Sequence, residues 1–160
     1  MWKPRRAGTL ATLFLAVVLG TAAWVLSTPP LSPGGQVVTV YKSPSCGCCV
    51  KWADRLSQRG YAVETVELPD LAPVKTAHGV PQELASCHTA LIGGYVVEGH
   101  VPIADVERML RERPAISGLA VPGMPIGSPG MEGPNPERYD VFSFDATGVR
   151  SVFASHGPGA

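Results

Sequence analysis

The sequence predicts a mixed α/β domain with one small sheet, flanking helices, an ordered loop rich in Pro and Gly, and a hairpin near the C-terminus. Three observations predict this fold class. Between residues 37 and 113, runs of β-branched and aromatic residues alternate with stretches in which apolar residues recur at helical spacing. Pro and Gly are then frequent in residues 114–136, where no helix or strand is expected. The length of 160 residues gives room for about one ordinary domain.

Residues 1–30 predict a signal peptide or a membrane anchor. Basic side chains near the start precede an uncharged run, residues 7–26, which is long enough for a transmembrane helix. Basic residues before such a run favour translocation of everything after it. The small residues at 21–23 also suit cleavage by a signal peptidase, so both alternatives stay open. In either case we expect the remainder outside the cytoplasm, after a Pro/Gly linker at residues 31–36.

The expected elements of residues 37–113 follow the order strand, helix, strand, helix, strand, strand, helix. The first strand, over 37–41, is buried because it is β-branched and aromatic, and Ser43-Pro44-Ser45 ends it. From Cys49, apolar residues at i, i+3, i+4 and i+7 predict a helix that stops at Gly60. The other expected elements are a strand at 61–67, a helix at 71–78, a hairpin of strands at 89–92 and 95–98, and a helix at 103–111. A parallel first strand pair followed by an antiparallel hairpin is the thioredoxin or glutaredoxin plan.

Residues 114–154 are expected to pack on the same domain. The stretch from 114 to 136 carries apolar side chains such as Leu119 and Val121, which favour an ordered loop over a disordered linker. Strands at 139–144 and 149–153 flank a turn sequence and predict a terminal hairpin.

The charge balance and the motif content exclude several classes of protein. Lys plus Arg is 13 and Asp plus Glu is 13, so there is no basic excess and we expect no nucleic-acid partner. Contact with a membrane is expected only through the N-terminal helix. The sequence contains no G-x-S-x-G, no H-E-x-x-H and no phosphate-binding loop.

Three of the four cysteines lie within Cys46-Gly47-Cys48-Cys49, between a strand end and a helix start. A thiol at a helix N-terminus is expected to be rich in thiolate, which attacks disulfides and also binds soft metals. A thiol–disulfide oxidoreductase needs only Cys46 as nucleophile and Cys49 as its partner, and Cys48 beside them invites wrong disulfides. For a soft ion such as Cu(I), a third sulfur strengthens the site. The pattern favours a metal site and leaves the oxidoreductase as the alternative.

The fourth cysteine, Cys87, precedes His88 at the start of the third expected strand. In a glutaredoxin-type arrangement this strand start lies beside the cysteine loop, so we expect Cys87 to face the other three sulfurs. The alternatives are a small buried hydrophobe for Cys87 and a hydrogen-bonded loop histidine for His88. His100, Met124 and Met131 are further candidate ligands, because imidazole binds copper and thioethers are soft donors. The alternatives are a methionine that fills space in an apolar loop for Met124 and Met131, and a bystander role for His100.

Several short motifs together carry a resemblance to a known family. They occupy residues 43–49 with Trp52, 79–81, 86–90, 98–102 and 121–132. In this combination they resemble the CopG-like bacterial metal-binding proteins, a group long catalogued as a domain of unknown function and linked to copper resistance. The resemblance covers about residues 37–153. It implies a thioredoxin-like fold and copper held in the periplasm by the sulfurs of Cys46, Cys48, Cys49 and Cys87.

We therefore expect a periplasmic copper-binding protein of copper resistance whose four cysteines hold Cu(I). Four sulfurs can bridge several soft ions, so a thiolate-bridged cluster fits the same residues. The expected partners are copper ions and other periplasmic copper-handling proteins. A thiol–disulfide or copper oxidoreductase that uses Cys46 and Cys49 is the alternative, and an iron–sulfur protein is a third interpretation of the cysteines.

Overall fold

The computed structural model describes residues 35–160, which belong to one compact unit, Leu31–Ala160. The predicted signal peptide or anchor lies outside the described residues, as does most of the predicted linker. In the described part, no helix is both long and apolar enough to cross a bilayer.

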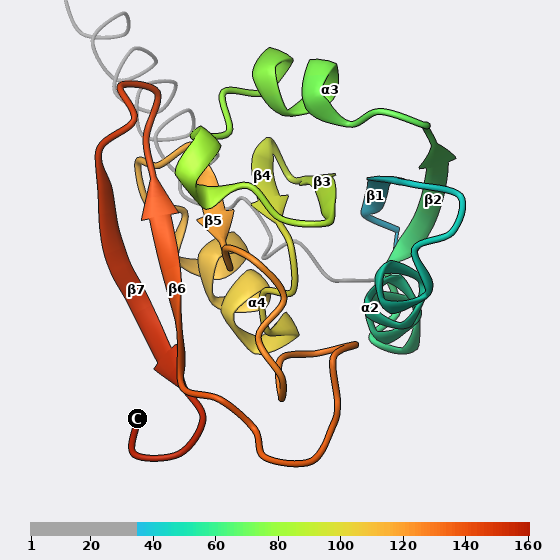
Figure 1. The fold of residues 1–160 in the computed structure, drawn as a ribbon. Coiled ribbons are helices and arrows are strands. Elements are labelled where there is room, and N and C mark those ends of the chain that lie inside the picture. Colours follow the sequence, from blue (N-terminus) through green and yellow to red (C-terminus); the bar gives the residue numbers. More distant parts are fainter. Residues whose placement is uncertain (1–34) are drawn as a thin grey trace, which may run out of the picture. The chain divides into compact units, whose positions relative to one another are not determined.

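A single sheet of seven strands organises this unit (Figure 1). Along the sheet the strands follow the order β2-β1-β3-β4-β5-β6-β7. β1 pairs in parallel with β2 and antiparallel with β3, and β3 pairs antiparallel with β4, so the predicted parallel pair and antiparallel hairpin are both present. The strands are β1 (Val37–Lys42), β2 (Ala62–Glu67), β3 (His88–Ile92), β4 (Tyr95–Glu98), β5 (Gly118–Ala120), β6 (Tyr139–Phe144) and β7 (Arg150–His156).

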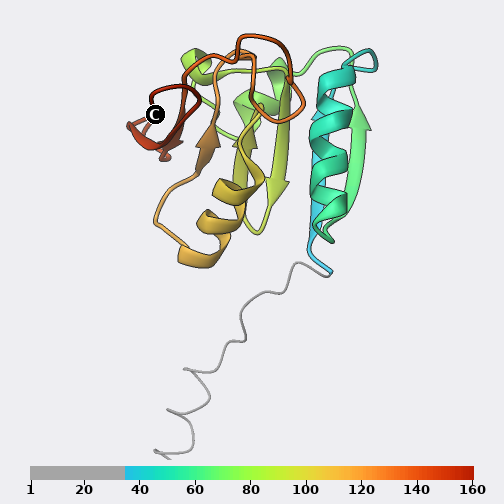
Figure 2. The same cartoon turned by 90° about the horizontal axis from the view of Figure 1, so that it is seen from below.

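The longer helices, α2 (Gly47–Gln58) and α4 (Ile103–Glu112), pack on one face of the sheet. The i, i+3, i+4, i+7 repeat from Cys49 is the buried face of α2, as the sequence predicts. Its Trp52 and Leu56 share a core with Val106 of α4 and with alternate residues of β1, such as Val38. Figure 2 shows α2 lying along β1 and β2.

The opposite face is covered more thinly. The short helix α3 (Ala72–Ala77) buries none of its residues, and the 3-10 helix η1 (Gln82–Leu84) contributes Leu84. Leu84 packs with Val96, Ala120 and Phe144 in a second, smaller core.

The prediction that residues 114–136 contain no regular element is wrong at one place, because Gly118–Ala120 form β5. This strand pairs in parallel with β4 and antiparallel with β6, and so joins the terminal hairpin to the sheet. Its three residues are all buried, so they show no alternation between polar and apolar positions. The absence of a side chain at Gly118 lets its backbone approach the carbonyl of Val96, where a Cβ atom would overlap. β7 also continues beyond the predicted end, to His156.

Candidate metal centre

The cysteine turn connects the end of β1 to the start of α2. Cys46 is the N-cap residue of α2, and Cys48 and Cys49 lie in its first turn. Cys49 belongs to the buried face of the helix, whereas Cys46 and Cys48 are partly exposed. In this structure Cys46 and Cys49 form a disulfide, with their Cα atoms 5.4 Å apart. Cys48 and Cys87 are free thiols.

Strand pairing explains why Cys87 lies beside this turn. Lys42, the last residue of β1, pairs with His88, the first residue of the antiparallel β3. The segment that follows β1 and the segment that precedes β3 therefore lie at the same end of these two strands. The Sγ atom of Cys87 lies 3.5 Å from that of Cys49, and the Sγ atoms of Cys46 and Cys48 are also 3.5 Å apart. All four sulfurs lie within 4.8 Å of one another.

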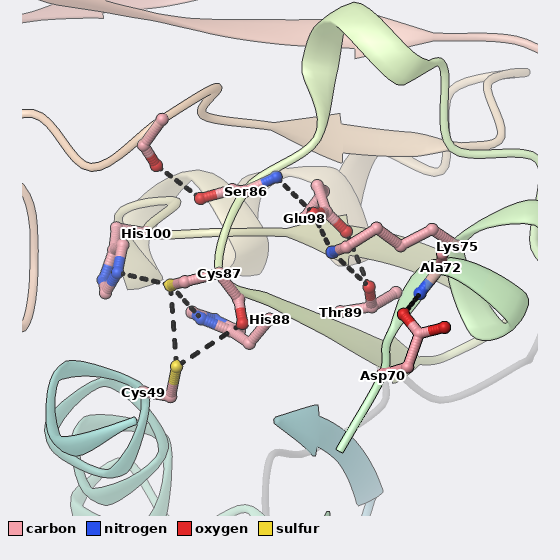
Figure 3. Close-up of polar contacts among 11 residues, drawn as sticks. Cys49, Asp70, Ala72, Lys75, Ser86, Cys87, His88, Thr89, Glu98 and His100 are labelled. Atoms are coloured by element: carbon pink, nitrogen blue, oxygen red, sulfur yellow. Dashed lines mark hydrogen bonds and ion pairs between the residues drawn. The ribbon is translucent and has the colours of Figure 1, made fainter. Parts of the chain in front are cut away.

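Two imidazoles border the same sulfur of Cys87 (Figure 3). His100 Nε2 lies 2.9 Å and His88 Nδ1 lies 3.3 Å from Cys87 Sγ. His100 Nδ1 is 2.8 Å from the carbonyl oxygen of Pro129, which can only accept a hydrogen bond. The proton of a neutral His100 therefore lies on Nδ1, and the lone pair of Nε2 is directed at Cys87. Cys87, His88 and His100 form a second group whose ligand atoms all lie within 4.8 Å.

Burial sets the protonation states of these groups. It lowers the pKa of His88 to about 3, with His100 and Lys75 lowering it further, and burial also lowers the pKa of His100. Both imidazoles are therefore neutral at neutral pH, which is the form that binds metals. Burial and the neighbouring Cys48 raise the pKa of Cys87 to about 12, so at neutral pH this group is present as the thiol, and its proton is removed when its sulfur binds a metal or attacks a disulfide.

His88 is held by packing, and one of its ring nitrogens is unpaired. Its side chain is fully buried, with its ring 4.6 Å from that of Trp52 and 5.1 Å from that of His100. Among the described residues, no group is within hydrogen-bond reach of His88 Nε2. Trp52 packs in the core, and its indole N–H also donates a hydrogen bond of 2.8 Å to the carbonyl of Val101.

The loop after β5 packs against the cysteine turn. Figure 1 shows this orange segment reaching towards the start of α2, where Gly130 packs against the carbonyl of Cys48. Glu132 holds the loop in place: it accepts a hydrogen bond from Gly130 N at 2.7 Å and pairs with Arg55 of α2. Hydrogen bonding from Gly130 lowers the pKa of Glu132, so its carboxylate is charged at neutral pH.

The two methionines have different positions. Met131 borders the same pocket as Cys48, between the loop and the start of α2. Met124 is 52% exposed and follows Gly123, which is bridged to Ser86, the residue before Cys87. The structure thus brings Met131 to the pocket at Cys48, while the side chain of Met124 is directed largely to solvent.

Gly130→Ala is expected to lower the free energy of unfolding by about 1–3 kcal/mol, because the new methyl group overlaps backbone atoms at the start of α2. Its Cβ would lie 2.7 Å from the Cys48 carbonyl oxygen and 3.4 Å from His100 Nδ1. Gly123→Ala is the matched control, since Gly123 also has a positive φ but a Cβ added there would meet no atom within 4 Å. Urea denaturation of both variants measures the difference. Equal losses would mean that backbone strain alone, and not contact with the cysteine turn, explains the effect.

A buried ion pair that sequence patterns do not reveal fixes the segment before β3. Glu98, at the end of β4, is fully buried and pairs with Lys75 of α3. Its carboxylate also accepts hydrogen bonds from Ser86 N at 2.6 Å and Thr89 Oγ1 at 2.7 Å (Figure 3). Burial raises the pKa of Glu98, and Lys75 opposes this shift. These bonds hold the residues on either side of Cys87 and His88. The one signal in the sequence is a charged residue that closes the apolar run Tyr95-Val96-Val97-Glu98.

The fold and this cluster define a class of protein. It is a mixed α/β domain that brings four sulfurs and two neutral imidazoles together where β1 ends and β3 begins. A family model described as a protein of unknown function, DUF411, matches residues 84–131, which include Cys87, His88 and His100. No curated protein matches the chain.

Two solved structures are similar to this chain. They are described as copper resistance protein CopG, form 1 and form 2, and each is 41% identical with a TM-score of 0.72. The match covers 76% of this chain and 98% of each of those chains. The chain belongs to the CopG family.

Proposed function

We propose that this protein binds copper as Cu(I) through Cys46, Cys48, Cys49 and Cys87, and that it acts in copper resistance. The observation that carries the proposal is the convergence of four sulfurs within 4.8 Å, contributed by two segments far apart in the sequence. Thiolates are soft ligands, and Cu(I) is a soft ion that accepts low coordination numbers. The family name of the two similar structures supports copper as the metal.

His100 and His88 are proposed as additional ligands or as partners of Cys87. The lone pair on His100 Nε2 faces Cys87 Sγ, so this imidazole can take the thiol proton when a metal binds, or bind the metal itself. Met131, at the pocket beside Cys48, is the better placed of the two thioethers, and Met124 is the more exposed.

The proposed setting is the periplasm, with export directed by residues 1–30 and other periplasmic copper-handling proteins as partners. A disulfide between Cys46 and Cys49 is compatible with an oxidising compartment. The arrangement of β1–β4 with α2 after the first strand also supports a thioredoxin-like origin for this part of the fold.

Anaerobic titration of the reduced protein with Cu(I) is expected to produce thiolate-to-copper charge-transfer absorption that saturates at a fixed metal count. Cys48→Ser is expected to reduce both the absorption and the metal count, because it removes one of the four sulfurs. Val50→Ala, at an exposed neighbouring position, is the matched control and is expected to behave as the wild type. An unchanged metal count in Cys48→Ser would refute the assignment.

A thiol–disulfide oxidoreductase is the second candidate, because Cys46 and Cys49 are joined in this structure. In that function Cys46, partly exposed at the N-cap of α2, attacks a substrate disulfide and Cys49 resolves the mixed disulfide. It predicts catalytic turnover of a disulfide substrate that survives Cys48→Ser and is lost in Cys46→Ser. Copper binding that depends on Cys48, without such turnover, would favour the first candidate.

A further inference from the structure

The disulfide in this protein lies in contact with a free thiol from another part of the chain. Cys49 Sγ, one half of the Cys46–Cys49 bridge, is 3.5 Å from Cys87 Sγ. Cys87 is not oxidised, and His100 Nε2 lies 2.9 Å from its sulfur (Figure 3). The Cys87 thiol thus contacts both a disulfide sulfur and the lone pair of a neutral imidazole. Thiolate attack on a neighbouring disulfide is the elementary step of exchange.

We propose that the disulfide migrates within the protein, from Cys46–Cys49 to Cys49–Cys87, which releases Cys46 as a free thiol. The exchange needs no metal, and it is therefore independent of the proposed copper binding. It makes Cys87 an internal exchange partner of the cysteine turn.

The step balances without an external oxidant or reductant. The thiol proton of Cys87 passes to His100 Nε2 as its sulfur attacks Cys49 Sγ, so that no free thiolate forms beforehand. The Cys49–Cys87 bond forms as the Cys46–Cys49 bond breaks, and Cys46 leaves with the electron pair of that bond. The proton held by His100 is returned through solvent to Cys46. One disulfide and two thiols are present before and after the step.

Two features favour this route over attack by Cys48 on Cys46. A Cys46–Cys48 bridge would close across a single residue at the start of a helix, whereas Cys49 and Cys87 approach from separate segments with freedom to adjust. Cys46 is also the better leaving group, because it is the N-cap residue of α2, where the helix dipole stabilises a thiolate.

Migration changes what the protein presents to solvent. Before it, the free thiols are Cys48 in the turn and Cys87 before β3; after it, they are Cys46 and Cys48, which lie in the same turn, and all three are partly exposed. The disulfide keeps the buried Cys49, exchanges Cys46 for Cys87, and thereby ties α2 to the segment before β3. An oxidised molecule thereby regains two adjacent thiols at its surface.

Tryptic mapping of the full-length, metal-free, oxidised protein tests this exchange directly. Cleavage after Lys42, Lys51, Lys75 and Arg108 leaves Cys46, Cys48 and Cys49 in residues 43–51 and Cys87 alone in residues 76–108. The original disulfide is internal to the first peptide, whereas the migrated one links the two peptides. The protein is incubated at neutral pH with N-ethylmaleimide, which blocks each free thiol and so prevents scrambling, and is then digested without reductant. We expect the linked pair of peptides to accumulate with time, with maleimide on Cys46 and Cys48.

Three variants separate the proposed route from its rivals. Cys48→Ser is expected to keep the linked peptides, whereas Cys49→Ser is expected to lose them. Cys87→Ala removes the attacking thiol without touching the helix core, and is expected to leave Cys46 unblocked. The proposal is overturned if the wild type shows only the internal disulfide with Cys48 and Cys87 blocked. It is also overturned if maleimide still reaches Cys46 in Cys87→Ala.

Discussion

Glu98→Ala is expected to lower the free energy of unfolding by about 3–5 kcal/mol, the usual cost of removing one partner from a buried ion pair. The truncation leaves Lys75, whose side chain is only 15% exposed, without its counter-charge. It also removes the acceptor for Ser86 N and for the Thr89 hydroxyl. For a domain whose total stability is on the order of 5–15 kcal/mol, this loss is a large fraction. Urea denaturation followed by Trp fluorescence measures it.

Two controls separate the buried pair from a general sensitivity to charge removal. Glu98→Gln keeps an oxygen that can accept from Ser86 N and loses only the charge, so its loss of stability is expected to be smaller than that of Glu98→Ala. Arg150→Ala breaks a pair with Glu83 in which both side chains are about half exposed, and it is expected to change stability little. A Glu98→Ala variant as stable as Arg150→Ala would show that the Glu98 network does not hold the segment before β3.

Closing the Cys46–Cys49 disulfide is expected to weaken Cu(I) binding by more than about a hundredfold. Loss of a partner in the second coordination shell alone typically costs roughly 10–100-fold in affinity. The disulfide withdraws two of the four proposed ligands themselves. Competition against a colorimetric Cu(I) chelator, under anaerobic conditions, compares the oxidised protein with protein that has been reduced and freed of reductant.

A double variant provides the control for this redox effect. Cys46→Ser with Cys49→Ser cannot form the disulfide, so its affinity for Cu(I) is expected to be low and the same after oxidising and reducing treatment. Equal affinity of oxidised and reduced wild-type protein would mean that Cys46 and Cys49 do not both bind the metal.

The sequence predicts those parts of the fold in which local pattern and burial agree. Helix α2 is predicted correctly because its apolar repeat from Cys49 is also its buried face. β5 escaped prediction because its three residues are buried on both faces and stand among Pro and Gly. A strand of this length is defined by its neighbours β4 and β6, and pairing with distant strands leaves no periodic signal in the sequence.

The candidate site likewise combines residues that the sequence reveals with residues that only the structure reveals. The three clustered cysteines are visible as a motif, and the predicted strand order already brings Cys87 to the same edge of the sheet. The supporting groups are not visible in this way. Glu98 looks like an ordinary strand residue until Lys75 approaches it from α3, and Pro129 contributes only a backbone carbonyl to His100. Such roles depend on tertiary contacts between segments, which local residue patterns do not encode.

X-ray absorption at the copper edge, on reduced protein loaded anaerobically with Cu(I), tests the shared copper site most directly. We expect an edge typical of Cu(I) and nearest neighbours that are predominantly sulfur, with fewer sulfurs per copper in Cys87→Ser than in the wild type. Copper surrounded mainly by nitrogen or oxygen, or a sulfur shell unchanged by Cys87→Ser, would contradict a site shared by the cysteine turn and the start of β3.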